Sequence, residues 1–192
     1  MKKKLLLTLV STLACTLGAA DFFNGGFEIC TPNSAGVAMP AHWVSNRVVT
    51  KNGTARLTKD PGCFRSGVFG LLTETEKDGR LYFRSLKTVR IKSGDFIEME
   101  IFHKGSGKFT LQYIAYGVED AKHSKFLSTL GTGKPLAASE EDWKQHRVKV
   151  KFIPPKRAQG KYTDFSILPV IMVYSDAEIV FDDFKLKVIP AK

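Results

Sequence analysis

The stretch DFIEMEIFHKGSGKFTLQYIAYG, residues 95–117, decides the fold class. Apolar and polar side chains alternate along both of its halves, and Gly105-Ser106-Gly107 separates the halves. A two-residue period is typical of a strand with one buried face, and a glycine-rich segment between two such runs is typical of a turn. We therefore predict strands at residues 95–104 and 108–117.

The same alternation recurs along most of the chain after position 46. Turn signals such as Asn52-Gly53, Asp60-Pro61-Gly62 and Asp78-Gly79 separate the runs, and no apolar stripe with helical spacing lasts ten residues. This pattern predicts an all-β fold, an antiparallel β-sandwich. The other expected strands lie at residues 47–50, 67–75, 80–91, 145–153, 164–174 and 177–189.

The first twenty residues have the features of a secretory signal peptide. Three lysines precede the apolar run Leu5–Leu17, and small residues, Gly18 and Ala20, follow it. The run is shorter than the roughly 20 residues that a transmembrane helix needs. We predict cleavage after Ala20, a secreted or periplasmic protein without a membrane span, and a single domain at residues 21–192. Lipidation at Cys15 is the alternative.

Charge and cysteine content limit the partners. Without the three signal lysines, 26 of the 29 Lys and Arg remain against 19 Asp and Glu, a net charge of +7. This excess favours an anionic partner, but no basic run or nucleic-acid motif is present, so we expect no nucleic acid. Cys30 and Cys63 would remain in the mature chain, either as a disulfide or as two free thiols.

Five segments share the order and spacing of motifs found in one type of domain. They are FFNGGFE (22–28), PAHW (40–43), SGDFIEMEIFHKGSGKFTLQY (93–113), DWKQHRVKVKFIPP (142–155) and EIVFDDFKLKV (178–188). Together they resemble the carbohydrate-binding modules of the family 4, 9 and 22 type, which are galactose-binding-domain-like jelly rolls. The resemblance implies jelly-roll topology and a non-catalytic module that binds a polysaccharide or glycoconjugate.

The resemblance also implies a structural calcium ion. Modules of this kind bring their terminal strands together, which would place Glu28 beside Asp182. Calcium takes six to eight oxygen ligands, and two neighbouring carboxylates repel each other without a cation. We expect Ca²⁺ to be held by Glu28 and Asp182, with Asp183 turned away by alternation. The alternative is that these carboxylates pair with Lys or Arg or face solvent.

A sugar site needs an aromatic side chain for the apolar side of the ring and planar polar groups for its hydroxyls. Outward-facing residues of the expected strands supply both, although they also fit an ordinary solvated face. Arg147 and Lys149 would suit an anionic glycan, whereas Trp43 and Trp143 fit packing better than binding. The candidate ligand-binding residues are Glu98, Glu100, Phe102, Gln112, Tyr116, Arg147 and Tyr174.

Catalysis has little support in the sequence. No nucleophile or metal-ligand motif is present, and the four His residues are scattered. Glu98 and Glu100 could flank a glycosidic bond, but paired Glu beside Arg and Lys is usually a surface ion-pair ladder. We expect no enzyme activity. The alternatives are an envelope structural or adhesive protein that binds a protein partner and, less favoured, a polysaccharide hydrolase or lyase.

Overall fold

A computed structural model describes residues 25–32, 36–46, 48–120 and 123–192. The predicted signal peptide, its cleavage site and Cys15 lie outside the described residues. Within them the chain is almost all β-structure, and its one helical element is a short 3-10 turn, η1 (Lys156–Ala158). No helix in the described ranges is long and apolar enough to cross a membrane.

The strands form two antiparallel sheets that share one long strand, β5 (Gly70–Ser85). The N-terminal part of β5 belongs to the first sheet, which we call the β7 sheet. In spatial order, the β7 sheet consists of β4 (Lys51–Thr58), β5, β13 (Ala177–Ile189), β7 (Phe96–Ser106) and the edge strand β11 (Lys144–Lys151).

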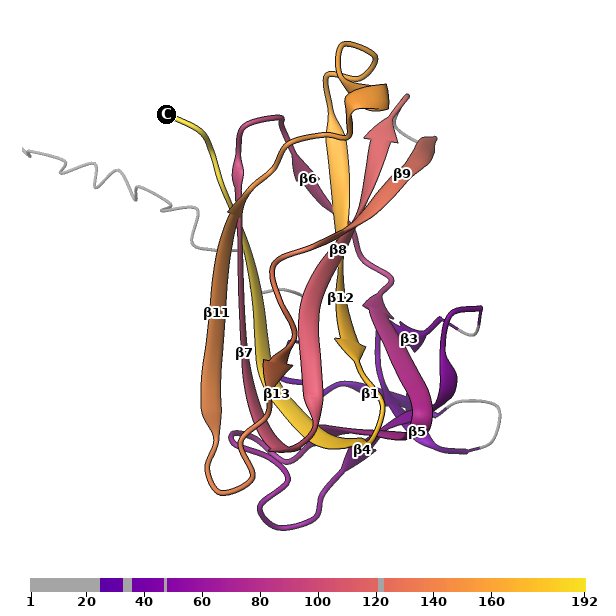
Figure 1. Cartoon of the computed structure of the whole chain (residues 1–192), viewed down its shortest axis with the longest axis vertical. Helices are drawn as coiled ribbons and strands as arrows, with labels where there is room; N and C mark the ends of the chain where they lie inside the picture. The colour runs from indigo at the N-terminus through magenta and orange to yellow at the C-terminus, as the bar shows by residue number, and fades with distance from the viewer. Residues whose placement is uncertain (1–24, 33–35, 47, 121–122) are drawn as a thin grey trace, which may run out of the picture.

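The C-terminal part of β5 belongs to the second sheet, which we call the β8 sheet. The β8 sheet consists of β3 (Trp43–Ser45), β5, β12 (Phe165–Val173), β8 (Lys108–Val118) and, beyond β8, β9 (Ser124–Gly131) and β10 (Leu136–Ala137) (Figure 1). In addition, β6 (Val89–Ile91) pairs with β12.

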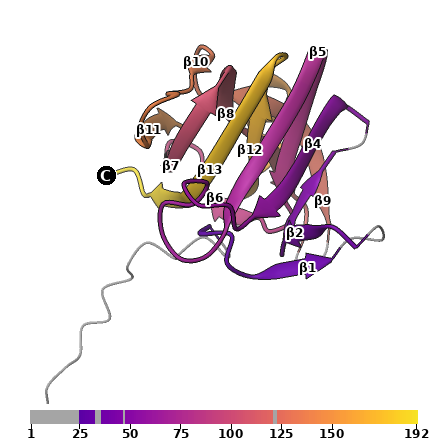
Figure 2. The same ribbon diagram turned by 90° about the horizontal axis from the view of Figure 1, so that it is seen from below.

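Two short strands, β1 (Cys30–Pro32) and β2 (Ala38–Pro40), form a separate hairpin near β4, at the periphery in Figure 2.

The hydrophobic core lies between the two sheets. Ile97, Met99 and Ile101 face inward from β7, and every second residue of β8 and β12 joins them. Trp43 is buried and stacks on Phe83 with 5.5 Å between ring centroids. Packing was the predicted role for Trp43, and the structure confirms it. The all-β, antiparallel sandwich is confirmed as well.

The strands expected at residues 95–104, 108–117, 145–153, 164–174 and 177–189 are present as β7, β8, β11, β12 and β13, with ends shifted by at most two residues. The other expectations were wrong. Residues 48–49 form a turn, so the described part of 47–50 is not a strand. In place of two strands at 67–75 and 80–91, residues 70–85 form the single strand β5, and residues 89–91 form the separate strand β6. Asp78 (φ 61°) lies where β5 leaves one sheet for the other. Of the longer strands, β4 and β9 have no counterpart among the expected strands.

The turn between β7 and β8 is a corner between the two sheets. Gly105 (φ 131°) and Gly107 (φ 104°) have backbone conformations that side chains disfavour. A Cβ atom on Gly105 would also lie 2.1 Å from the carbonyl oxygen of Glu178. Consequently β7 and β8 follow each other directly in the chain but pair with different strands.

Cys30 is exposed and Cys63 half-buried, and both are free thiols. Of the two alternatives that the sequence left open, the structure therefore has no disulfide between them. Desolvation, together with the nearby carboxylate of Asp60, raises the pKa of the Cys63 thiol, so its neutral form is favoured.

Candidate functional site

The seven predicted binding residues do not share one surface. Four lie on the outward side of the β7 sheet, two on the outward side of the β8 sheet, and the last directly follows β12. The packed core separates the two outward sides. In this order the residues are Glu98, Glu100, Phe102 and Arg147; Gln112 and Tyr116; and Tyr174.

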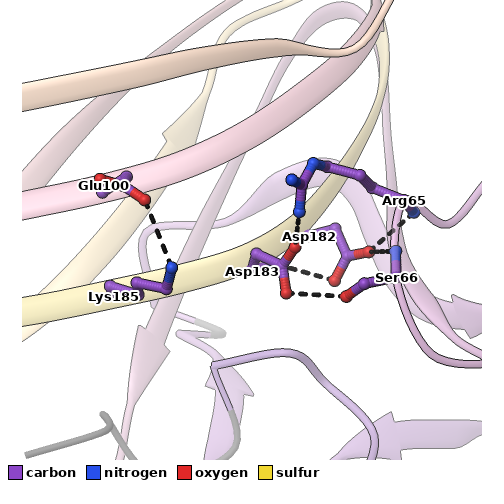
Figure 3. A network of polar contacts seen from close by, with 6 residues as sticks. All are labelled: Arg65, Ser66, Glu100, Asp182, Asp183 and Lys185. Atoms are coloured by element: carbon purple, nitrogen blue, oxygen red, sulfur yellow. Dashed lines mark hydrogen bonds and ion pairs between the residues drawn. The ribbon is translucent and has the colours of Figure 1, made fainter.

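The outward side of the β7 sheet carries a ladder of ion pairs. Arg147 contacts Glu98 at 2.7 Å. Lys185 contacts Glu100 at 3.5 Å, a pair that Figure 3 shows. The two glutamate side chains are only 16% and 18% exposed, whereas Arg147 and Lys185 are 61% and 63% exposed. Each carboxylate is therefore covered by its own cation.

Phe102 on the same side is also covered. The guanidinium carbon of Arg65 lies 3.7 Å from the centroid of the Phe102 ring, a cation–π contact. Arg65 comes from the loop at residues 59–69, which joins β4 to β5 and crosses this side of the sheet. One face of the aromatic ring is thus already occupied by a residue of the protein itself.

The carboxylate of Asp182 holds this loop in place by accepting hydrogen bonds from the loop's backbone N–H groups. Its Oδ2 accepts hydrogen bonds from the backbone N–H of Arg65 (2.8 Å) and of Ser66 (2.9 Å) (Figure 3). Asp183 accepts a hydrogen bond from the Ser66 hydroxyl (2.8 Å) and pairs with the Arg65 guanidinium. These contacts join the loop to the last strand, β13.

Glu28 joins the same loop to the N-terminal segment. Its carboxylate accepts hydrogen bonds from the backbone N–H of Val68 (3.0 Å) and Phe69 (3.2 Å). Gly67 makes this approach possible, because a Cβ atom there would lie 2.1 Å from Oε1 of Glu28. We call these contacts of Glu28, Asp182 and Asp183 with residues 65–69 the loop latch.

The loop latch contains both predicted calcium ligands, Glu28 and Asp182, but the groups that face them are N–H donors. Calcium needs six to eight oxygen ligands, so an ion here would have to displace these hydrogen bonds. Nowhere in the described residues do three or more His, Cys, Asp or Glu side chains form a group suited to a metal. As arranged, these residues do not fit calcium, and the ion stays a prediction.

The outward side of the β8 sheet is different, because it is apolar and aromatic. Ile114 of β8 and Leu168 and Val170 of β12 form a second hydrophobic cluster outside the main core. Tyr82 and Tyr116 pack against this cluster and are half-buried. Burial raises the pKa of Tyr82, so its hydroxyl is neutral at physiological pH.

One hydrogen bond shows how strongly this side is curved. The Tyr82 hydroxyl on β5 donates to Oγ1 of Thr129 on β9 at 3.2 Å, although β12 and β8 lie between those strands. In a flat sheet, three strand spacings would separate β5 from β9 by roughly 14 Å. A tyrosine side chain reaches Thr129 because the sheet curls, and β9 crosses β8 obliquely (Figure 1). We call this outward side of the β8 sheet the concave face.

Polar groups with spare hydrogen-bonding capacity line the apolar cluster. Within the described part of the chain, Nε2 of Gln112 donates only to the Met172 sulfur, at 3.2 Å, and a thioether is a weak acceptor. Phe126 is 55% exposed and lies edge-on to Tyr116, with 6.1 Å between ring centroids. The concave face thus combines aromatic surface with hydrogen-bonding groups.

Sequence reasoning missed Tyr82, Arg84, Phe126 and Thr129 on this face. Tyr82 and Arg84 alternate with the buried Leu81 and Phe83, so the signal was present in the run at 80–85. Phe126 and Thr129 had no such signal, because burial along β9 does not alternate regularly.

Comparisons with known proteins bear on the fold. No family model matches the chain, and no curated protein matches it. The CBM22-1 xylan-binding domain of Xyn10C from Paenibacillus barcinonensis is similar over 88% of this chain and 94% of its own length, at a TM-score of 0.51 and 12% identity.

Two further solved structures have the same fold. A cyclase from Fischerella sp. TAU, in complex with 4-(1H-indol-3-yl)butan-2-one, matches over 88% of this chain and 96% of its own length, at a TM-score of 0.55 and 14% identity. The arabinose-bound α-L-arabinofuranosidase MgGH51 matches over 86% of this chain and 26% of its own length, at a TM-score of 0.53 and 13% identity. At these identities the likeness shows the fold, a β-sandwich of the carbohydrate-binding-module type.

Proposed function

We propose that this protein is a non-catalytic glycan-binding module and that the concave face holds the glycan. The observation that carries the proposal is the aromatic cover of the buried second cluster, which Tyr82 and Tyr116 provide in place of another layer of the fold. These half-buried rings and the exposed Phe126 form the apolar surface of this face, and such a surface marks an interaction site when it is contiguous and bordered by polar groups. Here Gln112, Thr129 and Arg84 border it.

The chemistry of the face suits a sugar ring. The C–H side of a pyranose packs on aromatic rings, and its hydroxyls require planar donors and acceptors. Tyr82 and Tyr116 supply rings, and Gln112 supplies an amide that is poorly satisfied within the protein. This proposal keeps Gln112 and Tyr116 from the sequence-based candidates. Glu98, Glu100 and Arg147 are instead assigned to the ion-pair ladder on the opposite side, where Arg65 covers Phe102.

The neighbours support this proposal and also supply its competitor. One is a xylan-binding domain, which favours a carbohydrate partner. The cyclase has the same fold, so catalysis has to be tested directly. We further propose export through residues 1–20. An adhesive protein that binds a protein partner remains the second candidate for the same face.

Affinity electrophoresis in gels that contain soluble polysaccharides tests the proposal. Tyr116→Ala and Gln112→Ala should lose retention in the gel while thermal melts show that both variants are still folded. Phe102→Ala removes an aromatic ring from the opposite side and is the matched control, which should keep its retention. The proposal is wrong if Phe102→Ala alone loses retention, or if the native protein is retained by no polysaccharide.

A further inference from the structure

The strands of the β8 sheet differ from the rest of the chain in charge. The described strands of this sheet contain no Asp or Glu when β5 is counted only over residues 81–85, its part in this sheet; the acidic residues of β5, Glu74, Glu76 and Asp78, precede that part. The opposite side of the molecule carries Glu98, Glu100 and Asp182 on two adjacent strands. An anion that approaches the concave face therefore meets no carboxylate from the strands beneath it.

Arg84 supplies positive charge to this face. It alternates with the buried Phe83 and Ser85 and pairs across the sheet with Val44 of β3 and Val170 of β12. Burial has the larger effect on Tyr82 and raises its pKa, whereas the positive charge of Arg84 lowers that pKa. Arg84 is half-buried and has a valine on each side across the sheet, and a cation in such surroundings favours an anionic partner.

Among the described residues, no carboxylate pairs with Arg84. In the part of the chain that the structure describes, the arginines that form ion pairs are Arg56, Arg65 and Arg147. Arg84 is not among them. Its guanidinium presents planar donors that match a carboxylate with two parallel hydrogen bonds.

We propose that the ligand of the concave face is an acidic polysaccharide, one with uronic acid units. This inference rests on the proposed glycan-binding function and names its substrate class. A uronate ring lies on Tyr82, and its carboxylate pairs with Arg84. Gln112 lies two strands away, in the row Arg84–Val170–Gln112, and binds a hydroxyl of the same or the next sugar unit.

The opposite side offers a matched control for charge. Arg147 is also an arginine on an outward strand face, but Glu98 already neutralises it. Arg84→Gln and Arg147→Gln each remove one positive charge, so they change the net charge of the protein equally. Only Arg84→Gln removes the guanidinium from the concave face.

The probes are polygalacturonate, alginate and fully methyl-esterified polygalacturonate, which keeps the sugar backbone but masks its carboxylates. Affinities are measured by titration calorimetry in calcium-free buffer, and thermal melts confirm that each variant is folded. We expect the native protein to bind at least one acidic polymer and to bind the ester at least tenfold more weakly than polygalacturonate. Arg84→Gln should lose at least tenfold in affinity for the acidic polymer, and Arg147→Gln less than threefold.

The outcomes separate this inference from the proposed function. If the ester or a neutral xylan binds as tightly as the acidic polymers, or if Arg84→Gln and Arg147→Gln lose affinity equally, the acidic class is wrong and glycan binding stands. If only neutral polymers bind, the conclusion is the same. If no polysaccharide binds, acidic or neutral, the proposed function fails together with the inference.

Discussion

Tyr82 of β5 and Thr129 of β9 are hydrogen-bonded at 3.2 Å across two intervening strands. The bond joins β5 to β9 across the curved β8 sheet and orients the Tyr82 ring over the second hydrophobic cluster. It therefore links a feature of the fold, the curl of a sheet, to the orientation of an aromatic ring on the proposed glycan surface.

This hydrogen bond predicts coupling between two distant strands. Tyr82→Phe and Thr129→Val should each lower the free energy of unfolding by about 1 kcal/mol, since each removes one side-chain hydrogen bond. The double variant should lose less than the sum of the two, because the same bond is lost in all three proteins. Urea denaturation of the four proteins measures the coupling. Strictly additive losses would mean that the bond is not formed in solution.

Alternation predicted the inward residues of β7 and β8 well, because burial of every second side chain leaves a clear signal in the sequence. It could not tell which sheet each strand joins. Glu98 and Gln112 both point outward, yet the corner at Gly105 and Gly107 sends them to opposite sides of the molecule. One sequence-based surface thus becomes two in the structure.

The loop latch predicts different effects for two glycines in one loop. Gly62 and Gly67 both have positive φ, 84° and 65°, so alanine at either position strains the backbone by roughly 1 kcal/mol. At Gly67 the new Cβ would also displace the Glu28 carboxylate, whereas a Cβ at Gly62 would have no atom within 4 Å. Gly67→Ala should therefore cost about 1 kcal/mol more than Gly62→Ala in denaturant unfolding. Equal costs would show that Glu28 does not hold the loop.

Chelation tests the calcium prediction against the hydrogen bonds of the loop latch. The N–H groups that face Glu28 and Asp182 predict that a chelator leaves the melting temperature unchanged. Bound calcium at 100 times its dissociation constant would instead stabilise the fold by about 2.7 kcal/mol. A lower melting temperature after chelation, restored by added calcium, would show that the sequence-based prediction is right and that the loop rearranges around the ion.

His103 predicts loss of stability in mild acid. It is 5% exposed, and desolvation, with smaller contributions from His146 and Lys144, lowers its pKa from 6.5 to about 4. The folded state favours the neutral imidazole of His103. The free energy of unfolding that this group contributes is therefore complete above pH 6.5 and is lost as the pH falls toward 4. The loss amounts to about 3 kcal/mol at most.

A His103→Leu variant isolates this effect. Its free energy of unfolding should change less between pH 7 and pH 4 than that of the native protein, as measured by urea denaturation at each pH. Burial raises the pKa of Asp182, which acts in the opposite direction, but both proteins contain Asp182 and its contribution cancels. His123→Gln changes an exposed histidine and is the control. A native-like pH dependence in His103→Leu would contradict the assignment.

The ion-pair ladder predicts that Glu98 contributes little to stability and nothing to glycan binding. Glu98 pairs with Arg147, which is 61% exposed, and pairs near solvent are worth about 0.2–1 kcal/mol. Glu98→Gln should therefore lower the free energy of unfolding by less than about 1 kcal/mol and keep full retention in affinity gels. The same variant tests the hydrolase alternative, which needs two carboxylates that act on one bond. If the native protein releases reducing ends from a polysaccharide and Glu98→Gln does not, then the ladder is a catalytic site and the assignment of this side as structural is wrong.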